Sequence, residues 1–404
     1  MPGVPLISIN QAAFNERPFL FPPFFLIAIM HATTSSATDQ RWPQKASSFV
    51  LAFVFCLASS IAGHGQTPSP SPGPEAKIKA SDKTSSKDKI KRWFEFEQLT
   101  VGTRYHFIEN DNNSKAANND QYQFIAKMRF KFDAKGRYSV AANLATGPSF
   151  TTLWNASGWG TGKLQKNLNF RQLYFDAKPS KAVGVQIGGL SVNYGENTEA
   201  VTYDNDAFIV GERIQLHLPK KLYFDEISVT YARLADPTVP NVFNRLKRFD
   251  KQNYHQFLVR KQLNKAVGFS ADYTFESGID TFHQAVRFKL PKKQIIDTFL
   301  FENYERVDPD HSFGFNLLGE KRLNRIFTVS GGFADIHIKA FNADRFPPGK
   351  RIYFTGQLKI SPEFSLTTQF TQGVGFITPT IPRTRLDVIF NYNMLETLRR
   401  TKLF

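Results

Sequence analysis

The sequence lacks several features that common protein classes require. It has one cysteine, Cys56, which would be lost with an export signal, so disulfide and thiol chemistry are excluded from the exported chain. After residue 66 it has no apolar run of about 18 residues, which excludes a helical membrane protein. It has no Gly-x-Ser-x-Gly or His-Glu-x-x-His motif, and its histidines are scattered without ligand spacing. We therefore expect no catalytic residue, no metal site and no cofactor.

The amino-terminal 92 residues carry two segments of unusual composition. Residues 1–62 end in a short apolar stretch, Phe49–Ala62, that follows basic residues and closes on small ones, as in a secretory signal peptide. We expect that this start is over-extended and that Met30 is the true initiator. Residues 63–92 are rich in proline and lysine and predict a flexible periplasmic lead-in. Export argues against nucleic acid as a partner.

The remaining residues, 93–404, combine many aromatic residues with low average hydropathy. The chain has 40 phenylalanines, yet its mean hydropathy is −0.33. Apolar and polar residues alternate along strand-length runs, which gives each run one apolar and one polar face. The clearest run places Tyr122, Phe124, Met128, Phe130 and Phe132 opposite Gln123, Lys127, Arg129 and Lys131.

Seven short turn signals separate these runs and set the expected fold. Seven hairpins and one run at each end, near 98–108 and 384–392, make sixteen strands. We predict an all-β protein: a closed transmembrane up-and-down antiparallel barrel of about 16 strands, with short periplasmic turns, long external loops and both termini periplasmic. The turn signals are 133–136, 178–181, 218–221, 263–265, 290–293, 321–325 and 361–363.

The predicted connections at the other end are more polar, and several are long. Two strands have an ambiguous register. Around 208–216, Glu212 falls on the apolar face, and around 296–304 both faces carry apolar groups. A shift of one residue or a bulge would explain either case. The expected external connections are 110–120, 147–166, 191–206, 234–251, 276–281, 306–311, 339–350 and 373–383.

Three stretches, Phe170–Pro179, Val185–Gly189 and Asp204–Arg213, resemble the Gram-negative outer-membrane porins, in particular their sixteen-stranded, phosphate-selective-like branch. The resemblance implies a third external loop that folds inward and narrows the pore. It also implies residence among outer-membrane lipid and lipopolysaccharide, and a chain that could form a homotrimer. The terminal Phe404 resembles the aromatic end that the barrel-assembly machinery recognises. Residues 395–404 depart from that pattern because they do not alternate, so the last strand could end near Tyr392.

Charge on the polar faces predicts the selectivity of a pore. The inward faces carry ten basic groups against three acidic ones, which would make the lumen positive and favour anions modestly. The resemblance would fold the acidic loop 191–206 inward, opposite the basic side chains. The expected pore-lining basic residues are Lys127, Arg129, Arg171, Arg213 and Arg287, and the expected constriction-loop acidic residues are Glu196, Glu199, Asp204 and Asp206.

We therefore expect an anion-preferring porin for passive diffusion of small polar solutes and ions. The first alternative is a non-conducting outer-membrane barrel with a structural or adhesive role. The second is an outer-membrane hydrolase, for which Asp310-His311-Ser312 is the only local cluster of suitable residues. A solvated loop is the better explanation of that cluster. Planar-bilayer recording would separate the porin from the first alternative, the non-conducting barrel.

Overall fold

The computed structural model describes most of residues 93–404. Its gaps are 150–151, 199–207, 220–221, 235, 237, 248–251, 292–293, 309–310, 338–347, 375–381 and 402–404. The predicted signal and lead-in lie outside the described residues. So do Glu199, Asp204, Asp206 and Phe404.

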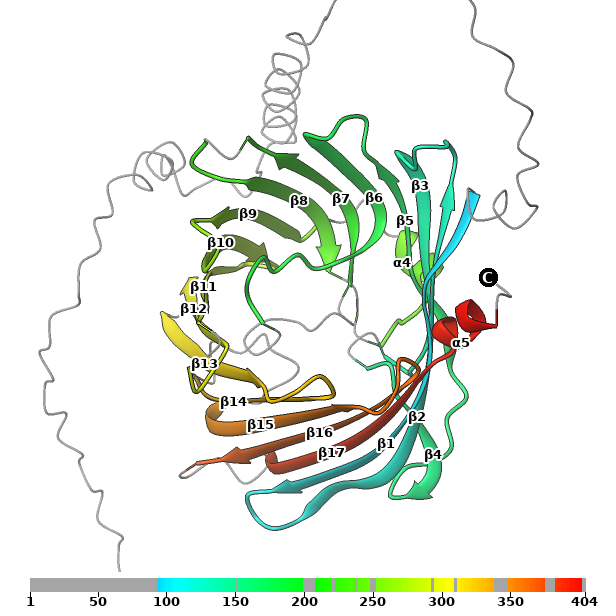
Figure 1. Ribbon diagram of the computed structural model, residues 1–404, viewed down its shortest axis with the longest axis vertical. Helices are drawn as coiled ribbons and strands as arrows, with labels where there is room; N and C mark the ends of the chain where they lie inside the picture. Colours follow the sequence, from blue (N-terminus) through cyan, green and yellow to red (C-terminus); the bar gives the residue numbers. More distant parts are fainter. Residues whose placement is uncertain are drawn as a thin grey trace, which may run out of the picture. The chain divides into compact units, whose positions relative to one another are not determined.

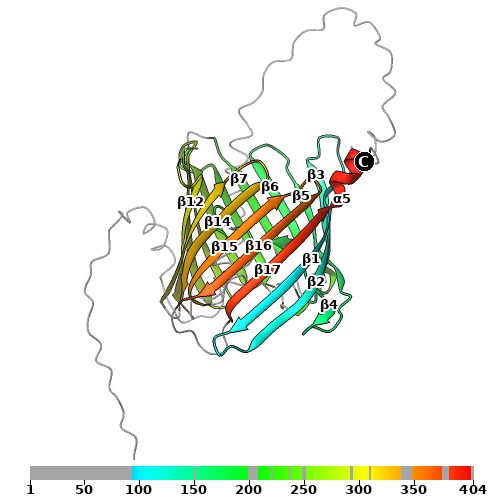
Figure 2. The same cartoon turned by 60° about the horizontal axis from the view of Figure 1, so that its bottom comes forward.

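The strands form one closed antiparallel barrel (Figures 1 and 2). The ring closes because β1 pairs with both β2 and β17. Sixteen strands make the wall; the short β4 pairs with the far part of β2, while β3 pairs directly with β5. The strands are β1 Phe94–Asn110, β2 Lys115–Lys131, β3 Tyr138–Thr146, β4 Asn155–Gly160, β5 Leu168–Ala177, β6 Val183–Ser191, β7 Phe208–His217, β8 Glu226–Leu234, β9 Tyr254–Gln262, β10 Val267–Glu276, β11 Ile279–Lys289, β12 Thr298–Asp308, β13 Ser312–Arg322, β14 Phe327–Ile336, β15 Gly349–Lys359, β16 Phe364–Gly373 and β17 Pro382–Asn393.

The predicted turns are confirmed. Each of the seven signals joins two strands that pair with one another, and the first and last strands of the wall lie where the flanking runs were expected. Phe94 of β1 pairs with Phe130, beside the first turn, and Asn393 of β17 pairs with Thr100. Both ends of the wall therefore lie at the turn end of the barrel.

The opposite end is less loop-rich than the sequence predicts. The expected loops 110–120 and 276–281 are wrong in length, because β1 and β2 continue to Asn110 and from Lys115, and only Ser277 and Gly278 join β10 to β11. Those two residues have φ of 51° and 90°, the positive values that a two-residue hairpin turn requires. The polar residues that led us to expect loops lie on strands instead. Their side chains can lie on the inward face of the barrel, which is polar.

The two faces of the wall differ as predicted. Apolar side chains point outward and are exposed, with Phe132 at 58% and Ile352 at 47%, whereas the neighbouring inward Arg351 is 1% exposed. Glu212 lies on the outward face in an unbroken register between Ile187 and Tyr231, so no shift or bulge is involved.

Strand β12 is apolar on both faces for a different reason. Its inward Tyr304 belongs to a buried cluster inside the barrel with Ala334, Ile336 and Tyr353. The inward Leu300 is also buried. Part of the interior of the barrel is therefore an apolar core, and the interior is only partly polar.

Within the described residues, two short helices accompany the barrel, α4 Val242–Leu246 and α5 Met394–Arg400. Among the described residues, no helix has the length and apolarity needed to cross a membrane. Helix α5 begins directly after β17, so the chain stops alternating close to Tyr392, as expected. Arg400 of α5 forms an ion pair with Glu363 in the β15–β16 turn at 2.9 Å. The Ser361 hydroxyl donates to the same carboxylate and lowers the pKa of Glu363.

Gly332 is required by close packing inside the barrel. A Cβ there would stand 2.5 Å from the Tyr353 hydroxyl oxygen and closer still to the Leu317 carbonyl oxygen. We expect Gly332→Ala to destabilise the barrel by about 1–3 kcal/mol through overpacking. Gly356→Ala is the matched control, since its Cβ would meet nothing closer than 3.6 Å. Urea unfolding in detergent measures both, and equal midpoints would contradict the packing described here.

Candidate functional site

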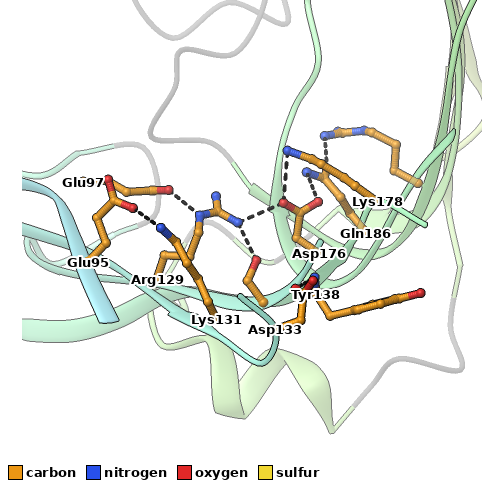
Figure 3. A network of polar contacts seen from close by, with 11 residues as sticks. Glu95, Glu97, Arg129, Lys131, Asp133, Tyr138, Asp176, Lys178 and Gln186 are labelled. Carbon is orange, nitrogen blue, oxygen red and sulfur yellow. Dashed lines mark hydrogen bonds and ion pairs between the residues drawn. The ribbon is translucent and has the colours of Figure 1, made fainter. Parts of the chain in front are cut away.

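Arg129 stands in a charged network on the inner wall near the turn end (Figure 3). It donates to Glu97 at 2.5 Å and to Asp176 at 2.8 Å, and Lys131 pairs with Glu95 at 2.6 Å. Lys178 lies 3.4 Å from the Asp176 carboxylate. These acidic residues lie outside the three acidic groups that the sequence placed on the wall, so its positive excess is smaller than predicted.

Arg213 belongs to the same network through one intermediate. Gln186 lies 3.5 Å from Asp176 and accepts from Arg213 at 3.3 Å. Arg213 is 5% exposed, and its other acceptors are the Thr230 hydroxyl and the Ser191 carbonyl. Its hydrogen-bond acceptors are therefore neutral, so its charge acts on the lumen through the field rather than by direct contact.

Arg171 binds main-chain carbonyls at the loop end of the wall. It is the extra residue where the β3–β5 register shifts, and it is 1% exposed. Its guanidinium donates to the carbonyls of Thr146 at 2.9 Å, Thr152 at 2.5 Å and Ser149. The structure thus places the Arg171 guanidinium against main-chain carbonyls.

Lys127 lies on the inward face of β2, opposite Asn143 of β3, and is half-buried. Within the described part of the chain, the Lys127 side chain has no hydrogen bond or ion pair. Its ammonium group is therefore a charge that the wall does not neutralise locally.

The chain after β6 runs inside the ring of strands (Figure 1). We call residues 192–198 the inward segment. Its contacts are with inward side chains of successive strands: Asn193 with Ser228 and Gln256, Glu196 with Ser270, and Asn197 with Asp272. Gly195, at φ +58°, permits this path because a Cβ there would meet the Ser270 side chain at 2.6 Å.

Glu196 is held by two arginines of the opposite strands. Arg260 donates to Oε1 from both Nε, at 2.8 Å, and Nη2, at 2.6 Å. Arg287 lies 3.3 Å from Oε2. The structure therefore brings together two of the predicted residues, Glu196 and Arg287, and adds Arg260. The alternation along 254–262 could have placed Arg260 on the inward face.

The far end of the inward segment is fixed to β12. The Thr198 amide and hydroxyl donate to the two oxygens of Glu302, at 2.5 and 2.7 Å. Asn316 donates to Glu302 at 3.3 Å and accepts from the Tyr353 hydroxyl at 2.6 Å. Glu302 and Asn316 are fully buried. We call Glu302, Asn316 and Tyr353 the anchor. No pattern in the sequence predicted it, because its three residues lie on three different strands.

A second charged cluster lies on β1 and β17. The Asp387 carboxylate is fully buried. Its Oδ1 lies 2.5 Å from His106 Nδ1 and 3.7 Å from Arg104 Nη1, and its Oδ2 accepts a hydrogen bond from Arg385 at 2.7 Å. The Arg104 guanidinium also lies 4.5 Å from the Trp154 ring. Among the described residues, no group of three or more His, Cys, Asp or Glu could hold a metal ion.

Solved structures with a similar fold include porins. No protein-family model and no curated protein matches the sequence. A triple mutant of the Rhodopseudomonas blastica porin is 10% identical with a TM-score of 0.47, over 73% of this chain and 99% of that chain. An engineered protein studied for asymmetric conductivity is 11% identical with a TM-score of 0.47, over 74% and 100%. The barrel itself is established by the strand pairing given above.

Proposed function

We propose that this barrel spans the outer membrane of a Gram-negative bacterium and passes small polar solutes and ions by passive diffusion. The observation that supports it best is the contrast between the faces of the closed sixteen-strand wall, apolar and exposed outside, polar and charged inside. A barrel of this size is wide enough for an aqueous channel. Such a pore performs no covalent chemistry.

We propose a modest anion preference for this pore. Lys127 and Arg213 favour it, because no acidic side chain pairs with either of them among the described residues. The carboxylates that pair with Arg129 and Arg260 weaken it. A small excess of one sign is enough to bias the flux through a narrow lumen of low dielectric.

The proposal includes the orientation and the partners of the barrel. The turns and both ends of the wall would face the periplasm, and the apolar outer face would contact lipid and lipopolysaccharide. Insertion would use the barrel-assembly machinery. The chain would act alone or as a homotrimer, and the solutes would be small anionic or polar molecules.

A non-conducting barrel with a structural or adhesive role is the second candidate. The inward segment and the internal cluster of Tyr304, Ala334, Ile336 and Tyr353 favour it, since they fill part of the interior. The membrane would then contain a folded barrel without a continuous water path.

We expect stepwise conductance when the purified protein is added to planar bilayers, with a reversal potential in a salt gradient that indicates a modest anion preference. The physical reason is the water-filled, weakly positive lumen. Protein unfolded before addition is the control. Folded barrels that insert and remain silent would support the second candidate.

A further inference from the structure

The inner wall carries two buried aspartate–histidine pairs with opposite surroundings. Asp387 pairs with His106, and two arginines stand beside it. Asp272 on β10 pairs with His283 on β11 at 3.0 Å, and both are buried. No arginine or lysine is among the described contacts of Asp272. Arginines therefore stand beside the first carboxylate, and none stands among the described contacts of the second.

The Asp272 carboxylate is saturated with hydrogen bonds from neutral groups. Gln256 at 3.3 Å, Thr274 at 2.9 Å and His283 lie against Oδ1. Asn197 of the inward segment donates to Oδ2 at 3.1 Å. The oxygens therefore contribute negative potential to their surroundings, with little capacity left for a direct ligand.

A cavity of about 20 Å³ lies beside this pair. It is lined by Asp272, Glu276, Gln256 and His283 together with neighbours that include no lysine or arginine. Two side-chain atoms of the lining residues have no partner: His283 Nε2 and Gln256 Oε1. Their residues are 6% and 4% exposed. In the tautomer that donates from Nδ1 to the aspartate, His283 Nε2 is an acceptor, as Gln256 Oε1 is.

We infer that this cavity binds an ammonium-type cation, either ammonium itself or the –NH₃⁺ end of a small amine. The Asp272 carboxylate supplies the field that a cation needs in a buried place, and the two acceptors call for a hydrogen-bond donor. The space suits one molecule of about the size of water. The site stands whether or not the barrel conducts, since it needs no solute flow.

The chemistry favours an N–H donor over a bare metal ion. An imidazole nitrogen accepts a hydrogen bond readily, whereas alkali ions prefer oxygen ligands. The field at Asp272 also selects against anions. An ammonium group satisfies both unpartnered acceptors with directional bonds and compensates the buried charge.

Calorimetric titration of the purified full-length protein in detergent, at pH 8 in phosphate buffer, tests the site. We expect saturable binding of ammonium chloride and none of tetramethylammonium chloride, which has no N–H. Asp272→Asn should weaken the affinity by about tenfold or more, because it removes the buried negative charge beside the cavity. Asp387→Asn is the matched control and should bind as the native protein does. Methylammonium binding as tightly as ammonium would assign the site to amines in general; weaker binding would assign it to the free ion.

Three results would overturn the inference: no saturable binding of either ion, equal binding of tetramethylammonium, or equal loss in the two aspartate variants. Should Asp272→Asn fail to fold, His283→Phe replaces it. Phenylalanine keeps the ring contact with Tyr304, now 4.4 Å between centroids, and removes the Nε2 acceptor. Unchanged ammonium affinity in that variant would contradict the site equally.

Discussion

Arg129→Glu combined with Arg213→Glu is expected to turn a weakly anion-preferring pore into a cation-preferring one. Each substitution changes the wall by two unit charges, and both positions lie in the network that already contains Glu97 and Asp176. One unit charge about 8 Å from an ion in water contributes about 0.5 kcal/mol before screening. Several such charges should shift the anion-to-cation ratio by roughly tenfold. Reversal potentials in a salt gradient measure it.

The control places the same charge change outside the lumen. Lys265→Glu with Arg325→Glu alters two exposed turn residues and should leave the reversal potential nearly unchanged. Because Arg213 also donates to the Ser191 carbonyl, its loss could disturb the start of the inward segment. Lys127→Glu, at a position without a described partner, gives an independent measurement. An unmoved reversal potential in both inner-wall variants would remove these residues from the ion path.

Local patterns were sufficient to predict the wall. The alternation in residues 122–132 and the seven turn signals each depend on neighbours in sequence, and period-2 geometry converts them directly into faces and hairpins. The lengths of the connections at 110–120 and 276–281 were wrong, because polarity marks an inward strand face as readily as a loop. At Glu212, alternation alone predicted the outward position correctly. The shift or bulge suggested for that strand is absent.

The interior of the barrel depended on contacts that sequence patterns do not reveal. Glu196 was expected to lie opposite Arg171 and Arg213, and the structure places it against Arg260 and Arg287. The sequence pattern predicted no role for Asp176, Glu97 or Glu302. Their partners are tens of residues away in the sequence, or more. Pairings of this kind depend on which strands the inward segment crosses.

Glu302→Leu is expected to release the inward segment. The open-channel current should then become larger or noisier. The substitution removes both acceptors of Thr198, and a hydrogen bond to a charged group contributes about 1.5–3 kcal/mol. Losing even one such bond would lower the docked population of residues 192–198 relative to the undocked one by about tenfold. Single-channel recording should show larger or noisier steps, and limited proteolysis should cut the chain between β6 and β7 faster.

Two variants separate release of the segment from damage to the wall. Glu302→Gln keeps an acceptor oxygen for Thr198, so it should behave much like the native protein. Thr198→Val removes the hydroxyl, which donates to Glu302 and accepts from Asn316 at 3.4 Å, while the bond from its backbone amide remains, so its effect should fall between the other two. If Glu302→Leu folds with native current noise and native protease resistance, the remaining contacts of Glu196 and Asn197 hold the segment by themselves. The anchor would then stabilise β12, β13 and β15 rather than fix the width of the pore.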